Sequence, residues 1–324
     1  MAYQNLTPDD ILEAVDSLGF QSDGRLLALN SYENRVYQIG MENSDPLVGK
    51  FYRPGRWTNE AILEEHEFAI ALAEAEIPLV APLAANGRTL HEHEGFRFAL
   101  YPRRGGHWPE LDDEALLLQI GRLVARIHAI GELQPFAHRP ELDIEHFGDD
   151  SMDTVLDANA LPPELVTPYE SLAEDLLDAI EEVFDACPNV QRLRLHGDLH
   201  PSNLLTRDEH IHIVDLDDAR TGPAIQDLWM FLSGSPDERT GQLQALLNGY
   251  TEFRQFDNRE LRLIEALRGL RIMHYAAWLT RRFDDPAFQR AFPWFAEPRY
   301  WEAHILSLRE QLAALAEPTL EYSP

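Results

Sequence analysis

Lysine is almost absent from this chain. The sequence contains 27 lysine and arginine residues, and Lys50 is the single lysine among them. Lysine ends in a compact ammonium on a flexible stem, whereas arginine ends in a wide planar fork. Lys50 lies in the apolar run 46–52 (Pro-Leu-Val-Gly-Lys-Phe-Tyr), which predicts a β-strand. A lysine left by coding bias alone could stand at any basic position, so its place in this strand favours a specific function for the ammonium group.

Basic charge is also scarce. The 27 basic residues stand against 56 acidic ones, which gives a net charge of −29. Nucleic acid is therefore not an expected partner, because binding to its phosphate backbone requires clustered lysine and arginine. The same argument disfavours binding to an anionic membrane surface. Solubility alone explains most of the carboxylates.

Cysteine, secretion signals and long apolar runs are scarce or missing as well. The one cysteine, Cys187, cannot form an internal disulfide, and we expect it to be a small buried residue. The first ten residues have neither the basic nor the apolar region of a secretion signal. No apolar stretch approaches the length of a membrane span. We expect a cytoplasmic protein that acts as a monomer and does not bind membranes.

Hydrophobic patterns divide the chain into two parts of an α+β protein. Residues 1–101 are predicted to alternate between helices at 7–19 and 58–76 and strands at 26–29, 35–39, 46–52, 89–93 and 96–101. After a turn-rich break at 102–106, helical spacing dominates, with one strand-like stretch at 193–217. Ser171 with Glu174, and Asp257 with Glu260, resemble N-cap pairs that begin two helices. We expect an N-terminal lobe at 1–101 and a larger C-terminal lobe at 102–324.

The strongest indication of chemistry is the segment 195–205, Leu-His-Gly-Asp-Leu-His-Pro-Ser-Asn-Leu-Leu. Asp198 stands five residues before Asn203, and Asp215 follows twelve residues later. Protein kinases use this Asp-x4-Asn spacing, followed by a metal-binding aspartate. A hydroxyl that attacks ATP needs a carboxylate to accept its proton, and the Mg²⁺ of a triphosphate takes oxygen ligands. We predict that Asp198 is the catalytic base, that Asn203 binds Mg²⁺, and that Asp215 is catalytic and also binds Mg²⁺.

Lys50 fits the same chemistry. Kinase folds use a strand lysine to hold the α- and β-phosphates of ATP, and a helix carboxylate holds that lysine in place. In the predicted helix 58–76, Glu65 lies about two turns before the apolar Leu72 and so on a similar face. We assign Glu65 as the partner of Lys50, with Glu64 as the alternative.

Other interpretations of these polar residues stay open. Asp198 and Asn203 could stabilise a turn and nothing more. Asp217 could help to bind a second metal ion or could belong to a solvated acidic turn. His196 and His200 could join the aspartates in the dinuclear site of a metallohydrolase, but that leaves Asn203 and Lys50 without a function. Loop histidines that bond to the backbone around Asp198 are the simpler explanation.

These segments resemble the aminoglycoside phosphotransferase and choline kinase-like branch of the protein-kinase superfamily. The similarity rests on 196–203 and on 214–220 followed by Gly222-Pro223. A closer similarity to the eukaryotic-like serine/threonine kinases of the bacterial stress response rests on 29–38, 50–54 and 226–230, and it extends over about 6–320. The resemblance implies a two-lobed fold with ATP in the cleft, where 1–101 is the ATP-binding lobe and 102–324 is the catalytic and substrate lobe. It also implies that Ser31 lies in the loop over the phosphates and that Asp227 braces the catalytic loop.

Two features differ from ordinary protein kinases. The loop 30–34 has no G-x-G-x-x-G, so the phosphates should be held by fewer amides together with the Ser31 hydroxyl. Only eleven residues separate Asp215 from Asp227, too few for an activation segment that would support a peptide. The leading expectation is an ATP- and Mg²⁺-dependent kinase of serine and threonine hydroxyls on proteins in a bacterial stress response. The alternatives are a kinase of amino alcohols or aminoglycoside-like molecules, and a non-catalytic nucleotide-binding regulator.

Overall fold

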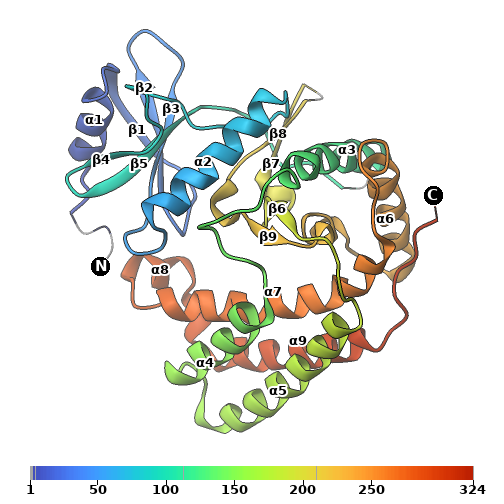
Figure 1. The fold of residues 1–324 in the computed structure, drawn as a ribbon. Coiled ribbons are helices and arrows are strands. Elements are labelled where there is room, and N and C mark those ends of the chain that lie inside the picture. The colour runs from blue at the N-terminus through green and yellow to red at the C-terminus, as the bar shows by residue number, and fades with distance from the viewer. Residues whose placement is uncertain (1–2, 4, 112, 209, 324) are drawn as a thin grey trace.

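An antiparallel sheet and a set of helices form two lobes of unequal size (Figure 1). The computed structural model describes residues 3, 5–111, 113–208 and 210–323. The N-terminal lobe is built on a sheet with the strand order β1-β2-β3-β5-β4. Its strands are β1 (Ser22–Ala28), β2 (Arg35–Met41), β3 (Leu47–Phe51), β4 (His91–His93) and β5 (Phe96–Pro102). The fold class expected from the sequence is therefore confirmed.

The two faces of this sheet are covered by different helices. The helix α1 (Pro8–Asp16) buries Ile11 and Val15 with Phe51 of β3 in one apolar cluster. The helix α2 (Asn59–Glu74) covers the opposite face, where Ile62 packs with Tyr52 and with Ala99 of β5. Successive side chains of a strand point to opposite faces. Lys50, next to Phe51, therefore lies on the α2 side of the sheet, between Val36 of β2 and Ala99 of β5 in the register.

Helices dominate the C-terminal lobe. They are α3 (Glu114–Gly131), α4 (Asp150–Asp157), α5 (Pro163–Asp185), α6 (Pro236–Tyr250), α7 (Leu263–Arg282), α8 (Pro286–Ala291) and α9 (Pro298–Leu315). The helices α3 and α6 approach closely because glycines face the opposing backbone. A Cβ at Gly121 would lie 1.9 Å from the carbonyl oxygen of Leu246, and one at Gly249 would lie 2.0 Å from that of Leu118.

The strand-like stretch at 193–217 forms short strands in place of one sheet. The strand β6 (Leu193–Leu195) pairs with β9 (Arg220–Gly222), and β7 (Leu204–Arg207) pairs with β8 (His210–Ile213). In Figure 1 the β6–β9 pair lies between α3 and α7, and the β7–β8 pair lies beside the C-terminal end of α2. The amide of Val80 donates to the carbonyl of Ile213 at 3.0 Å, which joins β8 to the N-terminal lobe.

One predicted helix start, at Ser171, is wrong, and the other, at Asp257, is confirmed only for the capping residue itself. Ser171 lies inside α5, which begins at Pro163. Tyr169, which precedes Ser171, already belongs to the buried face of this helix. Asp257 caps a short 3-10 helix, 258–262, by accepting from the amide of Arg259, and α7 begins only at Leu263. Glu260 does not complete that cap. It is buried and accepts from the amide of Ile225 at 2.8 Å.

The end of β5 lies next to the predicted division between the lobes. The strand ends at Pro102, and we keep 1–101 and 102–324 as the proposed lobes. No helix in the described part of the chain is long and apolar enough to cross a membrane.

Candidate active site

A cavity of about 810 Å³ lies between the two lobes. All six residues predicted for the site line it. From the N-terminal lobe they are Ser31, Lys50 and Glu65, and from the C-terminal lobe Asp198, Asn203 and Asp215. The cavity thus brings together side chains from β3, α2 and three separate loops.

Lys50 is the centre of an ion cluster. Its Nζ lies 3.1 Å from Asp215 Oδ1, 2.9 Å from Asp217 Oδ1 and 3.8 Å from Glu65 Oε1. Burial alone would lower the pKa of Lys50, but the carboxylates of Asp215, Asp217 and Glu65 raise that pKa well above its ordinary value. Lys50 as a residue is only 6% exposed, and its amine is therefore a fixed positive charge at the edge of the cavity.

Glu65 and Glu64 have different partners. Glu65 is buried on α2 and faces Lys50, and burial raises the pKa of its carboxyl from 4.5 to about 7 even though Lys50 opposes the shift. Glu64 turns to the C-terminal lobe, where its carboxylate accepts from the amides of Ala137, His138 and Arg139 at 2.5, 2.8 and 2.9 Å. The structure therefore places Glu65, and not Glu64, beside the lysine.

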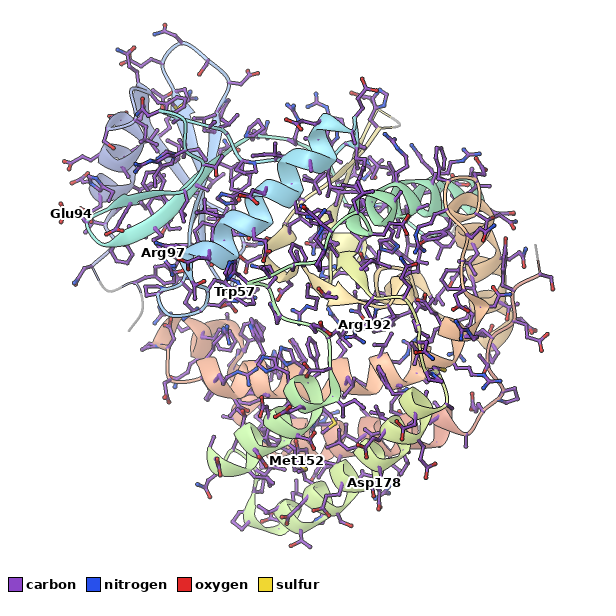
Figure 2. The ribbon with its side chains drawn as sticks, in the orientation of Figure 1. Trp57, Glu94, Arg97, Met152, Asp178 and Arg192 are labelled. Atoms are coloured by element: carbon purple, nitrogen blue, oxygen red, sulfur yellow. The ribbon has the colours of Figure 1, made fainter. Side chains whose placement is uncertain are left out.

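The segment that Glu64 binds also contributes a cation to the cluster. Arg139 Nη1 lies 3.8 Å from Glu65 Oε2, and its guanidinium lies 4.2 Å from the ring centre of Trp57. Figure 2 shows Trp57 beside the N-terminal end of α2. The Arg139 side chain also donates to the carbonyls of Ala219 and Asp217 at 2.8 and 2.5 Å. Arg139 thus ties α2 to the loop that follows Asp215.

The proposed base, Asp198, is held by an arginine and a histidine. Arg271 of α7 donates to its Oδ1, and His200 Nε2 lies 3.3 Å from its Oδ2. Burial raises the pKa of Asp198, but the hydrogen bond from His200 and the charge of Arg271 outweigh it and hold this pKa well below its usual range. The carboxylate therefore stays ionised and able to accept a hydrogen bond at any physiological pH.

The loop around Asp198 is fixed by hydrogen bonds to its backbone. Asn203 Nδ2 donates to the carbonyl of Asp198 at 2.9 Å, so its amide nitrogen holds the loop and its amide oxygen is the remaining polar end. Asp227 is fully buried and accepts from the amides of His196 and Gly197 at 2.8 Å each. Gly197 has φ +85°, and a Cβ there would lie 2.3 Å from the carbonyl oxygen of Asp218.

Asp215 follows β8 with a left-handed backbone, at φ 65° and ψ 72°. Aspartate is among the few residues other than glycine that adopt this region with some frequency. This conformation turns the chain from β8 into a short 3-10 helix, 216–218. The side chain of Asp215 is 54% exposed and lines the cavity next to Lys50.

Ser31 lies in the loop between β1 and β2, over the cavity. The neighbouring Glu33 connects this loop to both lobes. Its Oε1 lies 3.2 Å from Arg53 Nε and 3.1 Å from Arg56 Nη1, and its Oε2 accepts from Trp278 Nε1 at 2.8 Å and pairs with Arg282. Ion pairs fasten the loop where other kinases have a run of glycines.

Besides Arg139, two arginines of this site were missed by sequence reasoning. Arg56 lies 2.7 Å from Asp217 Oδ2 and 2.9 Å from Asp218 Oδ1, across the cleft. Burial opposes ionisation of Asp217, but Arg56, Lys50 and Arg139 lower its pKa well below the usual range. Asp217 is thus a buried ion-pair partner, which differs from both interpretations of the sequence. Arg271 was the second omission, and no pattern marked either one among so many arginines.

The donor set suits a hard cation better than zinc or iron. The amide oxygen of Asn203 and the carboxylate of Asp215 are oxygen donors on the cavity wall, as Mg²⁺ requires. His196 Nε2 instead bonds to the carbonyl of Val214 at 3.0 Å, and His200 Nδ1 accepts from the amide of Ser202 at 3.2 Å. In the part of the chain that the structure describes, no three His, Cys, Asp or Glu side chains form a metal-binding group. The metallohydrolase alternative therefore gains no support.

The chain belongs to the phosphotransferase enzyme family, whose model matches residues 25–264. It is accordingly an enzyme of ATP-dependent phosphoryl transfer. It is similar to stress response kinase A of Escherichia coli O157:H7, at 43% identity over 99% of this chain and 97% of that protein. It is also 41% identical, with the same coverage, to the serine/threonine protein kinase RdoA of Salmonella typhimurium (strain LT2).

Solved structures agree in fold. Amicoumacin kinase hAmiN in complex with AMP-PNP, Ca²⁺ and Ami is 16% identical, with a TM-score of 0.73 over 97% of this chain and 96% of that one. A microcompartment-associated aminopropanol kinase is 20% identical, with a TM-score of 0.71 over 96% of this chain and 99% of that one. At such identities the likeness concerns the fold alone.

Proposed function

We propose that this protein transfers the γ-phosphoryl group of ATP to serine and threonine hydroxyls of protein substrates in a bacterial stress response. The observation that carries the proposal is the convergence of Lys50, Asp198, Asn203 and Asp215 on one cavity. Identity of 41–43% over nearly the whole chain to kinases with these names supports the choice of acceptor.

Each side chain has a defined task in this proposal. The Lys50 ammonium, held by Glu65, binds the α- and β-phosphates, and the Ser31 hydroxyl binds phosphate from the loop above. Asp198 accepts a hydrogen bond from the attacking hydroxyl and aims it at the γ-phosphorus. Because its pKa is depressed, Asp198 is a weak base, so it orients the hydroxyl first and takes the proton late. Such timing fits the loose transition state of phosphoryl transfer.

Asn203 and Asp215 would hold Mg²⁺ through the amide oxygen and the carboxylate. The ion neutralises phosphate charge when it is bound with ATP. For this, Asp215 has to share its carboxylate between Lys50 and the metal. Its exposure of 54% leaves oxygen lone pairs accessible from the cavity. Asp227 positions Asp198 through the amides of His196 and Gly197 and does not touch the substrates.

The test is phosphorylation with γ-labelled ATP and Mg²⁺, first with the protein alone and then with a lysate of a bacterium under stress. We expect label in protein bands and, after acid hydrolysis, in phosphoserine and phosphothreonine. The Asp198→Asn variant is the matched control, because it keeps the ATP pocket and removes the base. Label confined to small molecules would refute the protein acceptor.

A kinase of small hydroxylated molecules is the second candidate. It is favoured by the short connection after Asp215, which forms a 3-10 turn, β9 and a second 3-10 turn that ends at Asp227. No platform for an extended peptide is formed by these described residues. The similar solved structures include kinases of amicoumacin and aminopropanol. Chromatography of the reaction with a metabolite extract would detect such a product.

A further inference from the structure

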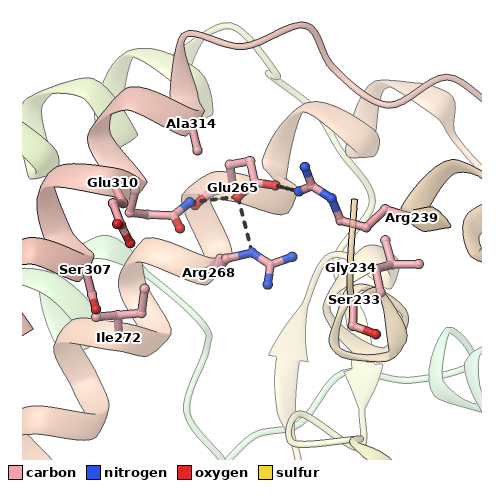
Figure 3. Close-up of a pocket in the computed structure, with 11 residues that line it drawn as sticks. Ser233, Gly234, Arg239, Glu265, Arg268, Ile272, Ser307, Glu310 and Ala314 are labelled. Carbon is pink, nitrogen blue, oxygen red and sulfur yellow. Dashed lines mark hydrogen bonds and ion pairs between the residues drawn. The ribbon is translucent and has the colours of Figure 1, made fainter. Parts of the chain in front are cut away.

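A second cavity, of about 340 Å³, lies outside the active site. It is bounded by the segment 232–234, α6, α7 and α9 (Figure 3). Its charged and amide side chains are Arg239, Glu265, Arg268, Glu310 and Gln311. Among the described residues, none lines both this cavity and the cleft. The phosphotransfer chemistry proposed above gives these residues no task.

One carboxylate holds two guanidinium groups at this cavity. Glu265 Oε1 lies 3.0 Å from Arg239 Nη1, and Oε2 lies 3.2 Å from Arg268 Nε. Gln311 Nε2 donates to Glu265 Oε2 and to the carbonyl of Glu265, both at 2.8 Å. In Figure 3 both guanidinium groups lie on the side of Glu265 that faces Ser233 and Gly234. The trio carries a net charge of +1, and its cations are held in place before any ligand arrives.

In each guanidinium group, two neighbouring nitrogens carry N–H donors that do not bond to Glu265. Arg239 pairs through Nη1, which leaves Nε and Nη2 side by side, and Arg268 pairs through Nε, which leaves its two terminal nitrogens. Arg239 Nε and Arg268 Nη2 are buried, yet no acceptor among the described residues bonds to either. A buried donor without a partner destabilises the folded protein, and a bound ion or water usually explains it.

We propose that this cavity binds a phosphate group, either free or as a phosphate monoester. Arginine forks bind carboxylates and phosphates in bidentate fashion. A planar carboxylate can satisfy one such fork, whereas a tetrahedral phosphate offers oxygens in two planes and can serve both Arg239 and Arg268. Arg239 and Arg268 both line the cavity, and Glu310, which lines it too, is exposed, so that solvent screens its charge.

A chain of contacts leads from this cavity to the catalytic loop. The Arg268 guanidinium lies 4.9 Å from the ring centre of Trp229. Trp229 Nε1 donates to Gln226 Oε1 at 3.1 Å, and Gln226 Nε2 donates to the carbonyl of Gly197 at 2.9 Å. Gly197 directly precedes Asp198. Because Trp229 and Gln226 are buried, a phosphate that fixes Arg268 also restrains the loop that carries the base.

Calorimetric titration of inorganic phosphate tests the site. The protein is first saturated with AMP-PNP and Mg²⁺ to block the cleft, and ionic strength is held constant with chloride. We expect saturable binding that weakens about tenfold or more in Arg239→Gln and in Arg268→Gln, since each loses charge-assisted hydrogen bonds. Arg122→Gln, which removes an exposed ion pair with Glu252, should bind as wild type does. A parallel titration with O-phosphoserine distinguishes a monoester from the free ion.

Binding that is absent, or equally strong in Arg239→Gln, would overturn the site. This variant does not touch Trp229, so it carries the test if Arg268→Gln fails to fold. Hydrogen exchange of the segment 195–205 tests the connection. We expect phosphate to slow exchange there in wild type but not in Trp229→Phe, which lacks the indole N–H and keeps both arginines. Equal slowing in Trp229→Phe would refute the contact chain.

Discussion

Replacing Lys50 by arginine separates charge from shape at the centre of the site. The ammonium lies within 4 Å of three carboxylates and Lys50 is buried, so a broader group has to displace its neighbours. Lys50→Arg keeps the positive charge that Asp217 and Glu65 require, and we expect it to melt close to wild type. The nitrogens of a guanidinium are spread over a plane, so no single one of them can lie between Glu65 and two phosphates as the lysine Nζ does. A reacting group that is misplaced by about 1 Å can lower the reaction rate by roughly 10²-fold, and we expect at least this loss in kcat/KM for ATP.

Lys50→Met is the matched comparison, because it has a similar length and no charge. Removing one partner of a buried ion pair costs about 3–5 kcal/mol. Here Asp217 keeps Arg56 at 2.7 Å and Asp215 is half exposed, so the lower end, about 3 kcal/mol, is expected. Thermal melting and turnover of labelled ATP are measured for wild type and both variants. Turnover of Lys50→Arg within threefold of wild type would refute the requirement for an ammonium, and a wild-type melting temperature in Lys50→Met would refute the energetics of the cluster.

Three further predictions concern the same cavity. Asp198→Asn should lower turnover by roughly 10²–10⁴, the usual contribution of a positioned base, and leave the affinity for ATP nearly unchanged in a fluorescence titration. Asn203→Ala and Asp215→Ala should lose the thermal stabilisation by Mg-ATP. If Mg-ATP raises the melting temperature of Asp215→Ala as much as that of wild type, Asp215 is not a metal ligand. Glu65 has its pKa raised from 4.5 to about 7 in the folded protein, so the folded state binds the extra proton and stability falls as pH rises through this range. Glu65→Gln should flatten that fall in urea unfolding midpoints, and an unchanged pH profile would contradict the raised pKa.

Local patterns predicted the parts of the site that lie close together in the sequence. The strand around Lys50 follows from an apolar run between polar segments, and β3 indeed spans Leu47–Phe51. The catalytic loop follows from the spacing of Asp198, Asn203 and Asp215, because these residues are separated by short local segments. Ser171 was misleading because a cap-like residue inside a helix has the same local sequence as one at its start. The buried face of α5 decided between the two, and burial depends on distant segments.

The missed residues share a physical reason. Arg56 bonds to Asp218 across 162 positions of the sequence, and Arg271 bonds to Asp198 across 73. Such pairs depend on how distant segments of the chain pack, and an arginine that pairs with a distant segment has no local signature. Asp217 illustrates the same point, because an acidic turn and a buried ion-pair partner have the same local sequence. Arg56 and Arg139, supplied from elsewhere, decide which one it is.

The contacts of Glu33 have a consequence for the kinetics of nucleotide exchange. This residue and Tyr32 tie the loop over the cavity to Arg282, Trp278 and Phe292 of the other lobe, with the Tyr32 and Phe292 ring centres 4.7 Å apart. We expect that ATP entering and ADP leaving past this loop wait until those contacts open. Loop opening of this kind often limits turnover. The contact between Glu33 and Arg282 is ionic, and salt screens such charges. Release of ADP should therefore become faster as ionic strength increases.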